Sequence, residues 1–295
     1  MKHIFWQYHP VIHLTFYIGA VLSGMLFMHP AFLACSIIFS ISCYMTVAKE
    51  KRRFLSGMLL VFLLLSVLNP VFNPSGSHVL FTYMAGRHYT LEALCYGMAM
   101  AAMFVTVLTW FASYQITMTS DKFLYCFSRL LPAVSMVLTM VLRFLPLYGR
   151  HLKKIADARK GIGKSAENGT LKERTEDGML LVSALTSWAL EGGMVTSSAM
   201  LSRGYGSGSR TSFCIYKWRG KEKCLLFVML ADIVLIVYCM IKGGAFVSYL
   251  PVLEIADLSD GYRMAGLIGY AAFLAIPTAA YVMEEIRWFI LRYRM

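Results

Sequence analysis

Charged residues are scarce in this sequence of 295 residues. Asp, Glu, Lys and Arg make up 15% of it, whereas soluble domains contain about 25%. Hydrophobic residues make up 58%, which excludes a disordered chain, and the small polar surface excludes an ordinary nucleic-acid-binding domain. Together with a mean hydropathy of +0.60, this composition indicates a membrane protein.

Several chemical signatures are absent as well. None of the seven cysteines has CxxC spacing and most fall in apolar segments, so they are predicted to be buried free thiols. His9 and His13 are four residues apart but have no third ligand nearby, so no metal site is expected. No paired-carboxylate, HExxH or nucleophile–base cluster is visible, and no catalytic residue is predicted. The cysteines are Cys35, Cys43, Cys95, Cys126, Cys214, Cys224 and Cys239.

The charges that are present are concentrated in one section. Residues 119–223 hold 17 of the 28 Lys and Arg and 8 of the 16 Asp and Glu, which leaves +9 of the net charge of +12 there. The sequence therefore predicts three parts. They are an N-terminal membrane bundle at 1–118, a basic cytoplasmic section at 119–223, and C-terminal membrane helices at 224–295.

Apolar blocks long enough to cross a membrane fill the first and last parts. A spanning helix needs about 20 mostly apolar residues. The first block lacks a small-residue cleavage site and is followed at once by a second block, so it is expected to be retained. The fold class predicted is an all-α polytopic membrane bundle of about six spans, at 11–28, 31–48, 54–72, 91–117, 224–243 and 264–283.

The orientation follows from the basic loop at 49–53, between the second and third spans. Lys and Arg are enriched in cytoplasmic loops, so this loop is placed inside. Counting spans from there puts both termini and residues 119–223 in the cytoplasm. The loops at 73–90 and 244–263 are then outside.

Two long amphipathic helices are predicted in the basic section. The first, at 133–160, begins after Pro132 and has apolar residues at steps of three and four, with a kink expected at Pro146. The second is predicted at 179–203, after a polar connector at 164–178. The two apolar stripes include Val141, Leu145 and Tyr148 in the first helix and Leu181, Leu185 and Trp188 in the second.

Both helices end in a basic residue framed by small ones. The first ends in Ala158-Arg159-Lys160-Gly161 and the second in Ser202-Arg203-Gly204. The helix dipole favours a cation at a C-terminus by about 0.3–1 kcal/mol, so one such end is an ordinary structural feature. Two of them on long helices favour insertion into pockets of a partner protein, since an arginine can pair with a carboxylate through two hydrogen bonds.

The first of these ends also has the loose spacing of a phosphate-binding P-loop, from Ala158 to Lys164-Ser165. A P-loop follows a β-strand and opens a helix. Here a helix precedes the segment and a polar connector follows it, so nucleotide binding is not expected.

These ends carry a family resemblance. Residues from about 50 to 240 resemble the T component (EcfT, CbiQ-like) of energy-coupling factor transporters, the ABC-type importers of vitamins and metal ions. Leu68-Asn69-Pro70 and Leu142-Arg143-Phe144-Leu145-Pro146 are similar to the family's segments, and Ser202-Arg203-Gly204 matches its second arginine motif. The first motif would read Ala-Arg-Gly, so either Arg159 or Lys160 takes the arginine's place. Arg159 is preferred because lysine lacks the planar guanidinium.

The resemblance implies a non-catalytic scaffold in a bacterial plasma membrane. Such a protein sits between a membrane S component, which binds the substrate, and two cytoplasmic ABC ATPases, which bind ATP and Mg. The chain itself would bind no cofactor. The resemblance implies that the ATPases contact Ala158, Arg159, Lys160, Gly161, Ser202, Arg203 and Gly204. It also implies that the S component contacts Val141, Leu145, Tyr148, Leu181, Leu185 and Trp188.

The alternatives are a secondary transporter that works alone and an integral membrane enzyme. A secondary transporter usually places ionisable groups near the bilayer midplane. Here His13, Glu92 and Asp232 fall toward the ends of their apolar blocks, and the sequence shows no inverted repeat.

Overall fold

The computed structural model describes residues 8–48, 51–73, 76, 78–83, 87–128, 131–164, 170–208, 216–243, 247–249, 254–255 and 260–293. The chain divides into two compact units. One unit combines Met1–Phe123 with Tyr216–Met295, and the other is Leu124–Ile215. The predicted N-terminal and C-terminal membrane parts thus pack together, and the second unit falls within the predicted basic section.

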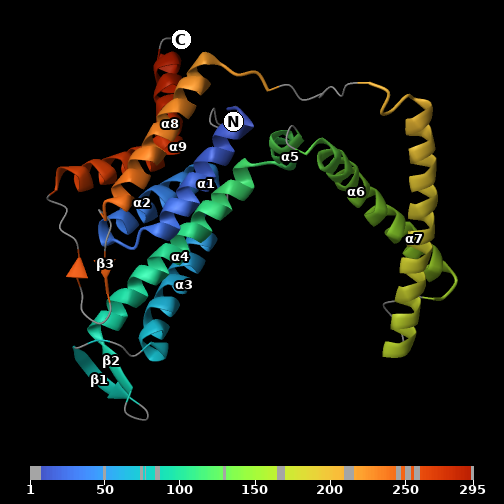
Figure 1. The fold of residues 1–295 in the computed structure, drawn as a ribbon. Coiled ribbons are helices and arrows are strands. Elements are labelled where there is room, and N and C mark those ends of the chain that lie inside the picture. The colour runs from blue at the N-terminus through green and yellow to red at the C-terminus, as the bar shows by residue number, and fades with distance from the viewer. Residues whose placement is uncertain are drawn as a thin grey trace. The chain divides into compact units, whose positions relative to one another are not determined.

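Helices make up almost all of the described chain, as predicted (Figure 1). The first unit contains α1 (Pro10–Leu26), α2 (Pro30–Val47), α3 (Lys51–Phe72), α4 (Leu91–Thr117), α8 (Gly220–Ile241) and α9 (Gly261–Tyr293). The second contains α6 (Pro132–Gly161) and α7 (Leu171–Ser202), and the short α5 (Ser120–Ser128) crosses the boundary. Two small antiparallel hairpins are formed by β1 (Val79–Tyr83) with β2 (Arg87–Thr90) and by β3 (Val247–Ser248) with β4 (Glu254–Ile255).

Local sequence explains where the first helices begin. His-Pro occurs before both α1 and α2, and in each case the histidine caps the helix. Nδ1 of His9 accepts a hydrogen bond from the N–H of Val11, and Nδ1 of His29 accepts one from Ala31, both at 3.3 Å. Proline is favoured at the first helical position because its fixed φ suits a helix and its missing N–H is not needed there.

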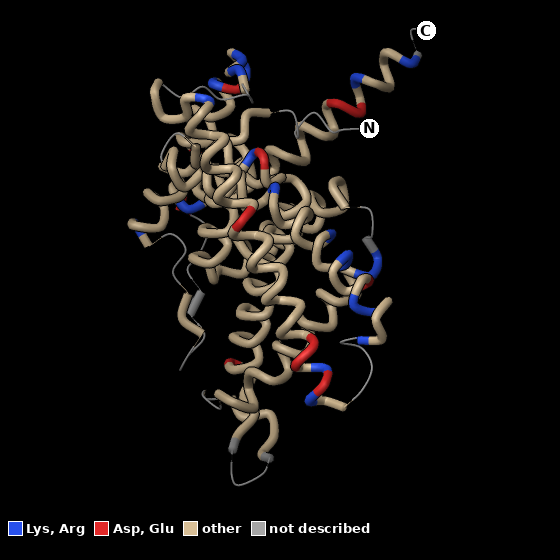
Figure 2. The backbone as a smooth tube through the Cα atoms, turned by 90° about the vertical axis from the view of Figure 1, so that its right-hand side faces the viewer, with Lys and Arg blue, Asp and Glu red and all other residues tan. Residues whose placement is uncertain are grey.

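The candidate membrane helices agree with five of the six predicted spans. By length and composition, α2, α3, α4, α8 and α9 could each cross a membrane, whereas α1 is apolar but has only 17 residues. The two helices of the second unit, α6 and α7, also meet this criterion, although they are less apolar than the other five. Their cytoplasmic location remains a prediction. Figure 2 shows that the long helices carry few charges over most of their length.

The two chain ends of the first unit lie at the same end of its helices (Figure 1). Burial raises the pKa of the Tyr8 hydroxyl, and the nearby carboxylates of Glu222 and Glu284 raise it further. Glu284 belongs to α9, so the beginning of the described chain lies near the second half of that helix. The β1–β2 hairpin lies at the opposite end of the helices.

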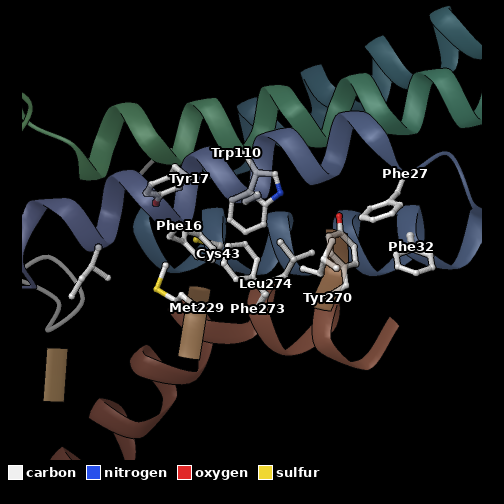
Figure 3. Close-up of a cluster of buried hydrophobic side chains, with 13 residues drawn as sticks. Phe16, Tyr17, Phe27, Phe32, Cys43, Trp110, Met229, Tyr270, Phe273 and Leu274 are labelled. Carbon is white, nitrogen blue, oxygen red and sulfur yellow. The ribbon is translucent and has the colours of Figure 1, made fainter. Parts of the chain in front are cut away.

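An aromatic core joins α1, α2, α4 and α9 (Figure 3). The ring of Phe16 lies 5.4 Å from that of Trp110 and 5.3 Å from that of Phe273. Gly19 allows α1 to approach α9, because a Cβ at this position would lie 2.7 Å from Cζ of Phe273. At the edge of the core, the hydroxyls of Tyr17 and Thr117 share a hydrogen bond of 3.0 Å.

The outer surface of this unit is apolar. On α3, large side chains face outward at Leu59, Leu60, Leu63 and Leu64. A soluble protein rarely exposes such a continuous apolar surface, whereas lipid covers it without cost. The six cysteines that the structure describes are all free, as predicted, but Cys43 and Cys239 alone among them are buried. Cys214 lies outside the described residues.

Candidate coupling site on α6 and α7

The two helices of the second unit form an antiparallel pair whose contact is centred on Trp188 of α7. The His151 ring stacks on it with centroids 3.6 Å apart, and the Tyr148 ring meets it edge-on at 5.7 Å. Both residues come from α6. The face of α6 that carries these contacts continues through Ile155 to Arg159 at steps of three and four residues, and all four side chains are half-buried.

The matching face of α7 consists of Asp177, Leu181, Leu185 and Trp188. These residues are also spaced by three and four and are half-buried, and α6 is the helix that packs against α7. We call the two faces together the α6–α7 interface. Its members therefore include Tyr148, Leu181, Leu185 and Trp188, which the sequence predicted to contact an S component. The other two predicted contacts, Val141 and Leu145, are exposed, and Leu145 retains 68% of its accessible surface.

The second helix begins earlier than the sequence predicted. The N–H of Thr170 donates to the Glu173 carboxylate at 2.9 Å, and the N–H of Glu173 donates to Oγ1 of Thr170 at 3.5 Å. This reciprocal capping box starts α7 at Leu171, so the predicted polar connector at 164–178 is wrong from Leu171 onward. The backbone hydrogen bond from Thr170 also lowers the pKa of the Glu173 carboxyl.

The early start of α7 places Asp177 opposite the end of α6. Its carboxylate forms an ion pair with the guanidinium of Arg159. The Arg159 side chain retains 20% of its accessible surface and that of Asp177 retains 17%. The predicted first coupling arginine is therefore paired within the chain. Lys160, the next residue, is exposed.

Both helices end in the same backbone motif, a Schellman turn closed by a glycine with positive φ. In α6, the N–H groups of Gly163 and Lys164 donate to the carbonyls of Lys160 and Arg159, each at 3.0 Å. In α7, Gly204 and Tyr205 donate to Leu201 and Met200, also at 3.0 Å. The two glycines have φ values of +78° and +74°, where a side chain would be strained.

The two arginines occupy different positions in this common motif. Arg203 directly precedes the left-handed Gly204, whereas Arg159 lies four residues before the left-handed Gly163. Ile162, which is 72% exposed, takes the place in α6 that corresponds to Arg203. The sequence-based interpretation that the helices end alike thus holds for the backbone but not for the arginines.

The Schellman turn at the end of α6 lies within the segment that has P-loop spacing, and it determines where the backbone N–H groups of that segment point. The N–H groups of Ile162, Gly163 and Lys164 are all used to close the end of α6. A P-loop instead directs such groups at phosphate from the start of a helix, where the dipole is positive. The end of α6 therefore lacks the backbone arrangement that binds a nucleotide.

The two basic ends lie at opposite ends of the helix pair. Arg159 contacts α7 near its start, while the Tyr205 hydroxyl that follows α7 donates to the sulfur of Met136 near the start of α6. Ser202, Arg203 and Gly204 are all exposed. Any partner that engages both ends must therefore reach two separate places on this unit.

A second apolar face of α7 points away from α6, and the sequence analysis missed it. At 100° per residue, this face lies opposite Trp188. Its side chains are uncovered, which is typical of a surface that binds a partner or lipid. The missed signal was apolar residues on both sides of one helix, so that a single stripe did not describe α7. The exposed residues are Met179, Val182, Leu190, Met194 and Leu201.

Within the described ranges, no group of three or more His, Cys, Asp or Glu side chains is arranged to hold a metal ion. The first unit has apolar helices around an aromatic core, and the second has a long helix pair with uncovered apolar faces and two basic ends. These features define a polytopic helical membrane protein whose second unit is a pair of long helices.

Comparison with known proteins places the chain in a family. The sequence model of the CbiQ family, described as cobalt transport protein, matches residues 2–213, which include both α6 and α7. The chain belongs to this family of membrane transport proteins. It is also similar to the energy-coupling factor transporter transmembrane protein EcfT of Exiguobacterium sibiricum. The two are 30% identical over 112 residues, which cover 38% of this chain and 42% of that relative, so less than half of the relative is matched.

Proposed function

We propose that this protein is the transmembrane scaffold of an energy-coupling factor importer. It transmits the ATP-driven motion of two cytoplasmic ABC ATPases to a membrane S component that binds a vitamin or metal ion. In this proposal the ends of α6 and α7, at 158–161 and 202–204, contact the ATPases. The uncovered apolar surface of the helix pair contacts the S component. ATP and Mg bind to the ATPases, and the chain itself is not catalytic.

The observation that carries the proposal is the long α6–α7 helix pair. It has a packed centre at Trp188, basic residues at its two ends, and no buried residue in α7 within the described chain. A helix of 32 residues with so little burial gains most of its stability from partners, because propensity alone stabilises isolated helices only marginally. The name of the Exiguobacterium relative supports the same assignment.

The proposal includes an orientation in the bacterial plasma membrane. Both termini, the loop at 49–53 and the α6–α7 pair lie in the cytoplasm, where the ATPases bind. The positive-inside rule supports this orientation, because residues 119–223 carry most of the excess of Lys and Arg. Residues 49 and 50 of the basic loop lie outside the described residues.

The test is affinity purification of the tagged full-length chain from the membranes of its own host. We expect two ATPase subunits and a small membrane protein to copurify. Arg203→Glu should release the ATPases, because it inverts one member of a charge pair. Lys164→Ala, at the P-loop spacing, should leave them bound.

Equal loss from the two variants would contradict the coupling assignment. The same experiment separates the alternatives, since a secondary transporter or a membrane enzyme would be active when the purified chain is reconstituted alone. The scaffold by itself should show no uptake and no turnover.

A further inference from the structure

Asp232 places a carboxylate in the middle of α8, the most apolar of the candidate membrane spans. It is the only charged residue between Lys223 and Lys242. At about 1.5 Å per residue, it lies about 18 Å from the beginning of α8 at Gly220 and about 14 Å from its end at Ile241. The sequence analysis placed Asp232 toward the end of its apolar block, and the bounds of α8 correct this to the middle of the helix.

Asp232 lies at the border between a packed side and a bare side of α8. At 100° per residue, Met229 and Ile236 lie about 50° to one side of it, and both are buried. The side chains about 40° to 100° to its other side are uncovered, and we call this side the Asp232 face. The exposed residues of the Asp232 face are Cys224, Val228, Ala231 and Leu235.

The chain itself supplies no partner for this carboxylate among the residues that the structure describes. Asp232 makes neither a hydrogen bond nor an ion pair with any of them. A charge inside the hydrocarbon is costly, so acidic side chains there pair with a cation or mark a path for ions. A path needs further ionisable groups, and α8 has no second charged residue near Asp232. The missing component is therefore a cation from outside the chain.

We propose that the Asp232 face of α8 binds a transmembrane helix of a partner protein, and that a lysine or arginine of that helix pairs with Asp232. The rest of the face suits this occupant. Cys224 and Ala231 are small, and small side chains let the backbones of two membrane helices approach closely, while a polar pair fixes their register. The proposal concerns the first unit alone and does not depend on the proposed function.

The first measurement is photocrosslinking in the membranes of the native host. A photoreactive amino acid replaces Leu235 in the full-length chain, and mass spectrometry identifies its adducts. We expect a peptide from a membrane helix that carries Lys or Arg. Val237 is the matched control, because it is 47% exposed at nearly the same depth but on the other side of α8, and it should react with lipid. Adducts of Leu235 with lipid alone, or with a second copy of this chain, would overturn the proposal.

The second measurement separates partner binding from folding. Asp232→Leu should weaken binding of the crosslinked partner about 100-fold, because it leaves the partner's cation buried without its pair. Asp232→Glu keeps the charge and should retain the partner. Neither substitution should lower the thermal unfolding midpoint of the isolated chain, since Asp232 makes no contact of its own there. Full partner binding by Asp232→Leu would overturn the proposal, and so would a lowered midpoint, which would assign the carboxylate to the chain's own fold.

The partner's cation provides the last test. Once the crosslink has identified it, the cation is replaced by methionine in the partner. The double variant with Asp232→Leu should then bind as weakly as either single variant, because both remove the same interaction. Losses that add would overturn the direct pairing. Uptake by the chain reconstituted alone, abolished by Asp232→Asn, would assign the carboxylate to an ion path and would also overturn the proposal.

Discussion

Trp188 is the side chain whose loss should disturb the second unit most. The sequence predicted it to contact an S component, whereas the structure packs it between Tyr148 and His151 of α6. Aromatic contacts of this kind contribute about 0.5–1.5 kcal/mol each. Trp188→Ala removes two of them, so the α6–α7 interface should lose about 1–3 kcal/mol.

Amide hydrogen exchange of the full-length chain in detergent or nanodiscs, followed by mass spectrometry, measures this loss. Each 1.4 kcal/mol corresponds to a tenfold change in an opening equilibrium. Exchange should therefore accelerate about 5-fold to 150-fold in the middle of α6 and α7. The core helices of the first unit should exchange as before.

Leu190→Ala provides the matched control. Leu190 lies two residues further along α7 on the opposite face and is 65% exposed, so its truncation removes no contact with α6. Equal acceleration in the two variants would refute the assignment of Trp188 to the α6–α7 interface. So would normal exchange in Trp188→Ala, because it would mean that α6 and α7 are held together elsewhere.

Two further predictions concern the core and the start of α7. Phe16→Ala should lower the free energy of unfolding by about 3–5 kcal/mol, because it leaves a cavity between Trp110 and Phe273, whereas Phe72→Ala at an exposed site should have little effect. Denaturation in mixed micelles measures both, and similar values would contradict the described core. Thr170→Ala removes the side-chain hydrogen bond of Thr170 that helps to lower the Glu173 pKa but keeps the larger backbone hydrogen bond, so carboxyl NMR should show this pKa rising part of the way toward its ordinary value. Because the folded pKa is lowered, the cap stabilises α7 above the ordinary pKa of Glu and is lost as pH falls through the lowered value. A Glu173 pKa unaffected by the substitution would exclude the contribution of the Thr170 side chain to this pKa.

Much of the fold follows from the sequence because the bilayer imposes a simple rule. A helix must satisfy its own backbone hydrogen bonds in lipid, so long apolar runs define spans wherever they occur. The predicted blocks at 31–48 and 91–117 coincide with α2 and α4 to within a residue or two. Glycine and proline likewise marked the bounds of α6, since both act through the local backbone.

The contacts of side chains between helices could not be predicted from the sequence in the same way. Periodicity shows that Tyr148 and Trp188 lie on apolar stripes, but it does not say whether a stripe faces another helix of the chain or a partner. On α7 both sides are apolar, so the pattern could not distinguish Trp188 from Leu190. That choice depends on where α6 lies, which is a property of the tertiary structure.

Arg159 shows most clearly which features the sequence determines and which depend on the tertiary structure. The sequence by itself determined that a helix ends near Gly161 with two adjacent cations, because the local backbone and the helix dipole suffice for that. The tertiary structure alone decided that Arg159 pairs with Asp177, since Asp177 is 18 residues away and reaches Arg159 because α7 starts at Leu171 and runs back along α6. An ion pair depends on distance in space, and no local pattern encodes that distance.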